Sequence, residues 1–247
     1  MPEILQKSIP YDVSKGKGLP GISPLSPGGW IIHDEVFAEQ MAERDRLLRH
    51  MPARVHCDAG ASVAAKQEVL SEVLRIVTNR AGYQISDAHV TRPDGVRVDL
   101  AGDDPLVTAA RLIQEDLLLH ETRDGTDGEH VLTAGVLCFP ASWTLSEKVG
   151  HPLTRIHAPV EVYDPNVAKR VQRLFDGIKS GRPLWRFNVL QYPIADLFQP
   201  RSERAPRRAD ADYETGEFTR SEHQALVRLP VSGAVLFALH TYVVQTG

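Results

Sequence analysis

The amino-acid sequence predicts an α+β fold built on an antiparallel sheet. Helical patterns come first in the chain, and two strand patterns follow at residues 95–102 and 130–139. A long helical pattern then precedes three further strand patterns. Strands that occur in runs, and do not alternate one by one with helices, favour an antiparallel sheet over β-α-β winding. At 247 residues the chain is long enough to bury a sizeable core.

The first 30 residues are rich in proline and glycine, which predicts an extended arm lying on the body of the protein. Residues 16–21 match the dinucleotide-binding pattern G-x-G-x-x-G. We reject a phosphate-binding loop here, because Pro20 lies inside the match and no strand pattern precedes it. We expect residues 1–90 to form an N-terminal arm and helical extension that packs on a core of residues 91–247, so that the two parts make one structural unit.

Two helices are predicted in the N-terminal part. The segment 33–50 carries Asp34 and Glu35 at its start and arginines towards its end, which suits the helix dipole. A second helix is expected to start near Ser62, because apolar residues follow it at helical spacing through residue 77.

The centre of the chain combines strands with a helix. Apolar and charged residues alternate in 95–102, which is typical of a half-buried strand. Asp104 and Pro105 suit the first positions of a helix, which we expect to run to Leu119. A polar turn then leads to the strand at 130–139.

The C-terminal part contains the clearest helical pattern, at 164–181. Asp164 suits its N-cap, Pro165 its first turn and Gly181 its end. The polar stretch 199–218 is expected to be a mobile loop. The three strands predicted around this loop are 183–190, 224–231 and 234–244, with a tight Ser232-Gly233 hairpin before the last.

Composition excludes several classes of protein. The formal net charge is −4, so nothing suggests a nucleic-acid partner. No apolar run approaches a membrane span and no secretory signal is visible, so we expect a soluble, cytoplasmic protein. Cys57 and Cys138 lie far apart without a C-x-x-C motif, which excludes a thiolate zinc site and a four-cysteine iron–sulfur cluster.

The segment 142–160 concentrates basic side chains in an irregular loop, among them Lys148, His151, Arg155 and His157. Either the loop is held by its own packing and its histidines bind no ligand, or the loop binds a ligand through a neutral imidazole. A histidine-rich zinc or non-haem iron site would require convergence with other histidines, the candidates being His56 and His240. Nothing in the spacing requires that convergence.

Other candidate chemistry is equally open from the residues alone. No G-x-S-x-G motif is present to indicate a Ser-His-Asp hydrolase. Arg186 and Asn188 share one face of a predicted strand, which is explained either by a surface strand or by polar partners in a pocket. His240 and Tyr242 share a face of the last strand, where a hydrogen-bonded core histidine is the alternative. Because a face of the sheet lies opposite the long helix in the predicted order, a small-molecule pocket between them is geometrically natural.

Three segments carry a resemblance to a known family. Residues 138–160 (CFPASWTLSEKVGHPLTRIHAPV), 182–200 (RPLWRFNVLQ, then DLFQP) and 220–243 (RSEHQALVRLPVSGAVLFALHTYV) resemble signature blocks of the haem-dependent oxidative N-demethylase α-subunit family. The resemblance runs in matching order from about residue 19 to 244. It implies an enlarged PAS-like fold with a haem pocket, and a monooxygenase-type oxidation of a secondary methylamine to a primary amine and formaldehyde. It further implies haem b, dioxygen, and electrons from NADPH delivered through a separate flavin and iron–sulfur reductase.

The resemblance also implies roles for individual residues. His157 is the expected axial ligand of the haem iron. Lys148, His151 and Arg155 are expected near the anionic propionates. The residues expected in the oxygen-side pocket, with Glu222 holding a protonated amine, are Arg186, Asn188, Glu222, His240 and Tyr242.

The chain departs from the family pattern at two positions, which makes dimethylamine a doubtful substrate. His223 stands where the family usually has arginine, and Val189 stands where it commonly has tryptophan. Two alternative functions stay open. One is a non-catalytic haem-binding PAS-like sensor or gas-binding protein that works through a partner. The other is a hydrolase or metal enzyme without haem.

Overall fold

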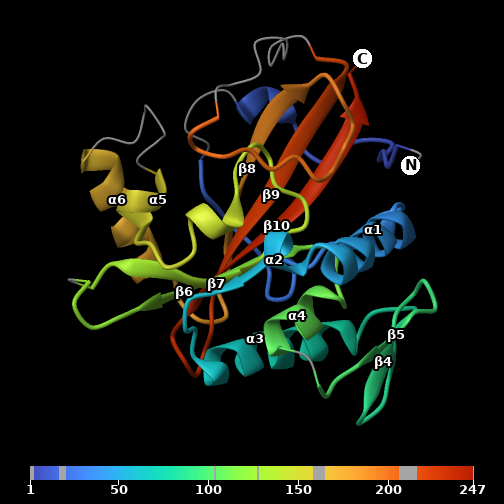
Figure 1. Ribbon diagram of the computed structural model, residues 1–247, viewed down its shortest axis with the longest axis horizontal. Coiled ribbons are helices and arrows are strands. Elements are labelled where there is room, and N and C mark those ends of the chain that lie inside the picture. Colours follow the sequence, from blue (N-terminus) through green and yellow to red (C-terminus); the bar gives the residue numbers. More distant parts are fainter. Residues whose placement is uncertain are drawn as a thin grey trace.

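The computed structural model describes residues 3–16, 21–102, 104–126, 128–157, 165–205 and 216–246. It confirms a mixed α+β fold with a large antiparallel sheet (Figure 1). The sheet has seven strands in the order β1-β8-β9-β10-β6-β7-β2, and every pair is antiparallel. Its strands are β1 (Ser23–Pro24), β2 (His56–Asp58), β6 (Asp116–Thr122), β7 (His130–Val136), β8 (Leu184–Tyr192), β9 (Phe218–Arg228) and β10 (Val235–Gln245).

Helices cover both faces of this sheet. In Figure 1, α5 and α6 lie on one side, and α1 to α4 lie on the other. The described part of the chain contains the α-helices α1 (Phe37–His50), α2 (Pro52–Val55), α3 (Val63–Val77), α4 (Pro105–Ala110), α5 (Leu153–His157) and α6 (Pro165–Gly177). The short 3-10 helices are η1 (Val13–Gly16) and η2 (Leu145–Glu147). A small second sheet consists of β3 (Gln84–Ile85), β4 (His89–Thr91) and β5 (Arg97–Asp99).

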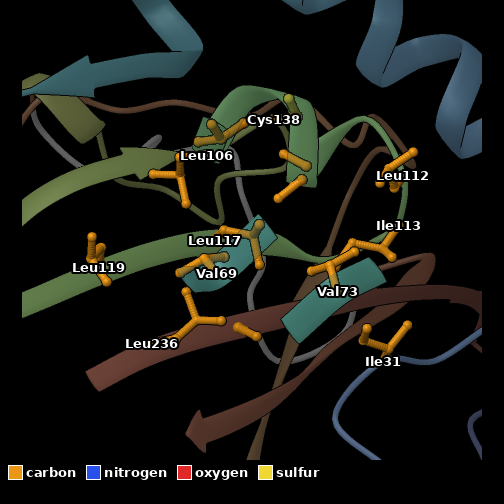
Figure 2. Close-up of a cluster of buried hydrophobic side chains, with 14 of the residues drawn as sticks. Ile31, Val69, Val73, Leu106, Leu112, Ile113, Leu117, Leu119, Cys138 and Leu236 are labelled. Atoms are coloured by element: carbon orange, nitrogen blue, oxygen red, sulfur yellow. The ribbon is translucent and has the colours of Figure 1, made fainter. Parts of the chain in front are cut away.

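The main hydrophobic core lies on the α3 and α4 side of the large sheet (Figure 2). Val69 and Val73 of α3 are fully buried there, and the Ser62 hydroxyl caps that helix by accepting from Ala65 N at 3.3 Å. From the sheet, Leu117, Leu119 and Leu236 face the same core (Figure 2). The helix predicted to start near Ser62 is thereby confirmed.

One predicted element is wrong. The helix expected from Asp104 to Leu119 ends at Ala110, and the strand β6 begins at Asp116. Leu117, Leu118 and Leu119 are all buried, because β6 lies inside the sheet with apolar groups on both faces. A short continuous apolar run of this kind has no period-2 signal and cannot be told from a buried helix segment.

The C-terminal strands begin and end differently from the prediction. Strand β9 begins at Phe218, six residues before the predicted Gln224. Its first half is polar in sequence and yet buried, from Thr219 to Gln224, so the usual alternation of apolar residues is missing. The strand predicted at 95–102 forms only as β5, and it belongs to the small sheet.

The segment after β8 was expected to be a mobile loop. Its first part instead is hydrogen-bonded to the body of the protein: Ser142 N donates to Gln199 O at 3.0 Å, and Ser202 Oγ donates to Glu147 at 2.6 Å. We call residues 196–205 the strap. Residues 206–215 lie outside the described residues, as do 17–20 of the glycine pattern and Asp164.

The other predicted helices form with changed limits. The helix predicted at 33–50 forms as α1 from Phe37, and the one predicted at 164–181 ends at Gly177 as α6. Arg228 of β9 donates to the carbonyl oxygens of Phe175 and Ile178, which ties the C-terminal end of α6 to the sheet. No helix in the described ranges has the length and apolar character needed to cross a bilayer.

Candidate functional site

A cavity of about 840 Å³ lies between the large sheet and a wall formed by the loop around η2, by α5 and α6, and by the strap. This volume lies within the range typical of small-molecule and cofactor pockets. The apolar part of its lining includes Leu118, Leu132, Trp143, Leu153, Ile156, Val171, Phe175, Leu226, Phe237 and Leu239. The polar and charged part includes His120, Ser142, Lys148, His157, Arg186, Asn188, Arg201, Glu203, Glu222 and Gln224.

His157 is positioned by a short backbone pairing with the sheet. Leu132 N of β7 donates to His151 O, and Gly150 N donates to Leu132 O at 2.7 Å, so α5 starts directly from the sheet. At the end of α5, the Nδ1 of His157 lies 2.8 Å from Leu153 O. Because a carbonyl only accepts, Nδ1 carries the proton, and in the neutral ring Nε2 carries the lone pair.

The His157 ring is kept neutral by its surroundings. Burial lowers its pKa, and the bond to Leu153 O opposes that effect only in part. The nearby cations Lys148 and Arg186 lower the pKa further. A neutral imidazole whose other nitrogen bonds a carbonyl is the form in which histidine ligates metal ions. The segment 158–160 that follows His157 lies outside the described residues.

A cluster of charges forms one end of the cavity. Lys148 Nζ donates to Ile156 O at 2.6 Å and to a carboxylate oxygen of Glu203 in the strap. Arg155 donates to the other Glu203 oxygen at 3.1 Å, although its own side chain is exposed and does not line the cavity. Arg201 lines the cavity, and its Nε is buried without a hydrogen-bond partner among the described residues.

The sheet face of the cavity carries a carboxylate that accepts two side-chain hydrogen bonds, and the backbone of the same residue makes a third. Asn188 Nδ2 and Gln224 Nε2 each donate to Glu222 Oε2 at 2.9 Å, and Glu222 N donates to Asn188 Oδ1 at 2.9 Å. Within the described part of the chain, Glu222 Oε1 is buried and accepts no hydrogen bond. Among the described residues, this oxygen thus lacks the donor that a buried carboxylate oxygen needs.

Arg186 lies beside this carboxylate on β8, where it pairs with Gln224 of β9 in the strand register. Burial lowers the pKa of Arg186, while the charge of Glu222 opposes the shift. The Nε of Arg186 is buried without a hydrogen-bond partner in the described ranges. Arg186, Asn188 and Glu222, all predicted from sequence, therefore meet on one face.

Two residues predicted for this pocket lie elsewhere. His240 and Tyr242 of β10 are buried on the opposite face of the sheet, because cavity residues Phe237 and Leu239 alternate with them along the strand. His151 is exposed and is not part of the cavity lining. Among the residues predicted for the haem, only Lys148 and His157 line the cavity.

The positions where the chain departs from the family pattern also lie off the cavity. His223 stacks on Trp185 with ring centroids 4.6 Å apart, on the face opposite Glu222. Val189 is likewise not in the lining. Neither His223 nor Val189 can alter substrate choice through direct contact in this cavity.

Sequence reasoning missed His120, Arg201, Glu203 and Gln224. His120 was hidden in the apolar run of β6, and its ring packs edge-on against Phe175 with centroids 5.3 Å apart. Burial lowers its pKa to about 3. Arg201 and Glu203 come from the strap, whose proximity to Lys148 could not be read from spacing. Among the described residues, no three His, Cys, Asp or Glu side chains are grouped as metal ligands.

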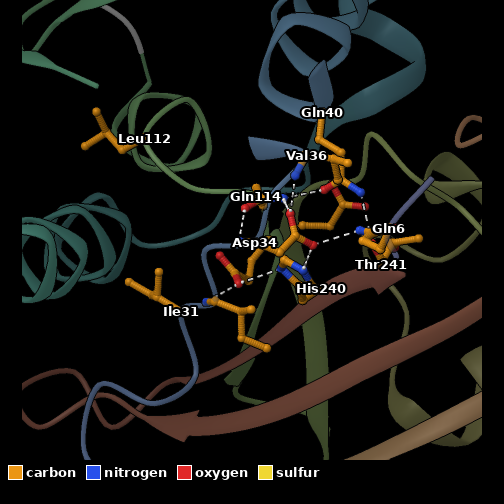
Figure 3. Close-up of polar contacts among 12 residues, drawn as sticks. Gln6, Ile31, Asp34, Val36, Gln40, Leu112, Gln114, His240 and Thr241 are labelled. Carbon is orange, nitrogen blue, oxygen red and sulfur yellow. Dashed lines mark hydrogen bonds and ion pairs between the residues drawn. The ribbon is translucent and has the colours of Figure 1, made fainter. Parts of the chain in front are cut away.

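His240 instead belongs to a buried polar network (Figure 3). Its Nε2 donates to Asp34 and its Nδ1 to Glu115, both at 3.1 Å. Gln114 and Gln6 also donate to Asp34, at 2.7 and 2.8 Å. Burial alone would lower the pKa of His240, but the two carboxylates outweigh it and raise the pKa to about 9. The ring is therefore a buried cation that links β10 to Asp34, before α1, and to Glu115, before β6.

We expect this network to make stability fall at alkaline pH. A histidine with a raised folded-state pKa contributes stability that is complete below its unfolded pKa of 6.5 and is lost as the pH rises through about 9. The shift corresponds to about 3 kcal/mol. Burial lowers the pKa of His120 to about 3 and that of His223 to about 4. These two histidines therefore make stability fall as the pH drops below 6.5, because the unfolded chain then binds protons that the folded protein does not.

Urea unfolding between pH 5 and 9.5 should therefore show greatest stability near neutral pH. His240→Gln should be less stable at pH 6.5, and its free energy of unfolding should fall less steeply as the pH rises above neutral, which we call the alkaline limb. His50→Gln, at an exposed position, serves as the control. An alkaline limb unchanged in His240→Gln would contradict the assignment of that limb to His240.

One comparison with known proteins identifies the family. A family model described as "Haem-dependent oxidative N-demethylase, alpha subunit-like" matches residues 21–246. The match covers nearly the whole chain, so the chain belongs to this family.

Proposed function

We propose that this family member binds haem b in the cavity and oxidatively N-demethylates a small methylated amine. The observation that carries the proposal is the combination of a neutral, carbonyl-anchored His157 with a cavity of about 840 Å³ lined by apolar side chains. We infer further that the antiparallel sheet with α5 and α6 on one face is an enlarged PAS-like fold. Family membership supports both inferences.

The residues present fit a haem group. His157 would ligate the iron through Nε2, because Nδ1 is committed to Leu153 O. Lys148 and Arg201 would hold the propionates, and Arg155 would assist from the rim; His151 is too exposed to be placed with them. The buried and unpartnered Nε of Arg201 supports this reading, since a buried donor needs an acceptor.

Haem, when bound and reduced, supplies the activation of dioxygen; the protein supplies placement and charge. Glu222 would bind a protonated amine through Oε1, while Asn188 and Gln224 keep Oε2 in place. Arg186 would donate hydrogen bonds on the same side. Leu226, Phe237 and Leu239 would exclude water from the methyl group. The methyl carbon would leave as formaldehyde, and the nitrogen as a primary amine.

Electrons would come from a separate protein. The family description names an alpha subunit, which indicates a multi-subunit enzyme. We propose a reductase that takes electrons from NADPH and passes them through flavin and iron–sulfur centres.

Turnover tests the proposal against the sensor alternative. The haem-loaded protein is incubated with dioxygen, an artificial reductant and a panel of methylated secondary amines that includes dimethylamine. We expect formaldehyde and primary amine in equal amounts for at least one substrate. Binding of carbon monoxide or dioxygen without formaldehyde from any of these amines would favour a haem sensor or gas-binding protein.

A further inference from the structure

At one end of the cavity, the cations Lys148 and Arg155 are already paired with a carboxylate of the protein itself. Glu203 accepts from Lys148 through Oε1 and from Arg155 through Oε2. It therefore lies where a carboxylate of a bound ligand would have to lie to reach both cations. Lys148 has only 9% of its side chain exposed, so it always needs an anionic partner.

The Glu203 side chain is not needed to keep the strap in place. Glu147 holds the strap in place, because it accepts from the Ser202 hydroxyl at 2.6 Å and from the backbone Glu203 N at 2.9 Å. Gln199 adds backbone bonds to Pro140 and Ser142. Since Glu203 remains 20% exposed, its carboxylate can turn into solvent while the strap stays anchored.

We propose that Glu203 is a displaceable internal carboxylate, which pairs with Lys148 and Arg155 until a carboxylate of an entering ligand takes its place. The inference rests on the proposed function, in which that ligand is a porphyrin with two propionates. Exchange of one carboxylate for another leaves Lys148 paired throughout. The cavity can then be empty of ligand without an unpaired buried ammonium.

This arrangement makes Glu203 a competitor of the ligand. Removing its charge should tighten binding of a ligand with carboxylates, because the competing pair is lost and Lys148 gains an anionic partner only when the ligand binds. If Glu203 had only a structural role, removing its charge would instead lower the affinity for the ligand, because the strap would loosen.

Porphyrins with and without charge separate these readings. Metal-free protoporphyrin IX carries the carboxylates but no iron, and its dimethyl ester carries neither charge nor iron. Both affinities are measured by fluorescence titration, and the affinity for protoporphyrin IX is divided by the affinity for its dimethyl ester. This ratio reports the anion site, because a general loosening of the strap would weaken both affinities alike. We expect this ratio to rise about three- to tenfold in Glu203→Gln.

Two matched variants complete the test. Glu147→Gln removes a strap anchor and should leave the ratio at the parent value. Lys148→Met should lower the ratio and abolish most of the gain from Glu203→Gln in the double variant. A ratio that is unchanged or lower in Glu203→Gln overturns the proposal.

The outcome is separable from that of the proposed function. If the ratio rises as expected but His157→Ala leaves the haem spectrum unchanged, the carboxylate exchange stands and His157 ligation fails. If the parent binds haem through His157 but the ratio does not rise, only the exchange fails. If the parent binds neither porphyrin, both are overturned.

Discussion

Asp116→Ala is expected to cost about 3–5 kcal/mol of folding free energy, the range for breaking a buried ion pair by removing one partner. Arg44 NH1 of α1 lies 2.8 Å from Asp116 Oδ1, and both side chains are fully buried. Asp116 also accepts from the backbone N–H groups of Cys138 and Phe139, both at 2.8 Å. The substitution strands a guanidinium and two amide donors in the core.

The same pair joins the N-terminal extension to the core. Arg44 belongs to residues 1–90 and Asp116 to residues 91–247, so we propose that the two parts unfold together. Urea unfolding followed by circular dichroism and tryptophan fluorescence should give coincident transitions in the parent. The control is Asp99→Ala, whose carboxylate is 72% exposed and should change stability by less than about 0.5 kcal/mol. Separate transitions for the two probes would contradict the single unit.

Glu222→Gln is expected to weaken binding of a protonated amine by about 30-fold or more, because truncating one partner of a buried charge pair costs about 2–5 kcal/mol. The amide keeps the shape of the side chain but removes the charge that Oε1 would present to an ammonium group. Binding is measured as a spectral shift of the haem-loaded protein. The proposal also requires a proportional loss of formaldehyde production.

A neutral ligand distinguishes charge recognition from general damage. An ether of the same size as the amine should bind the parent and Glu222→Gln equally. Glu72→Gln, outside the cavity, should behave as the parent. Equal affinity of the amine for the parent and Glu222→Gln would remove Glu222 from the substrate site.

Much of the fold followed from the sequence because its signals are local. The apolar spacing that follows Ser62 predicted α3 with nearly its observed limits. The prediction missed strand β6, because the burial of both its faces comes from neighbours far away in sequence. The prediction missed the first half of β9 for a related reason. Residues such as Arg220 and Glu222 are polar, and partners on other elements make their burial possible.

The candidate site was predictable only in part. Strand alternation correctly placed Arg186 and Asn188 on one face of a strand, and it left open whether that face lines a pocket, as the structure shows it does. The same alternation could not say which face of β10 meets the cavity, since both faces are buried, and His240 was assigned to the wrong side of the sheet. The contact of Glu203 with Lys148 spans 55 residues and has no local signal.

The central claim is that His157 is the iron ligand of a haem held in this cavity, and absorption spectroscopy during haem titration tests it most directly. The parent protein and His151→Ala, altered at an exposed position outside the cavity, should show the same strong Soret band. His157→Ala should shift or lose the band, and added imidazole should restore it. A parent that stays colourless with haem supplied, or a His157→Ala spectrum identical to the parent, would contradict the account.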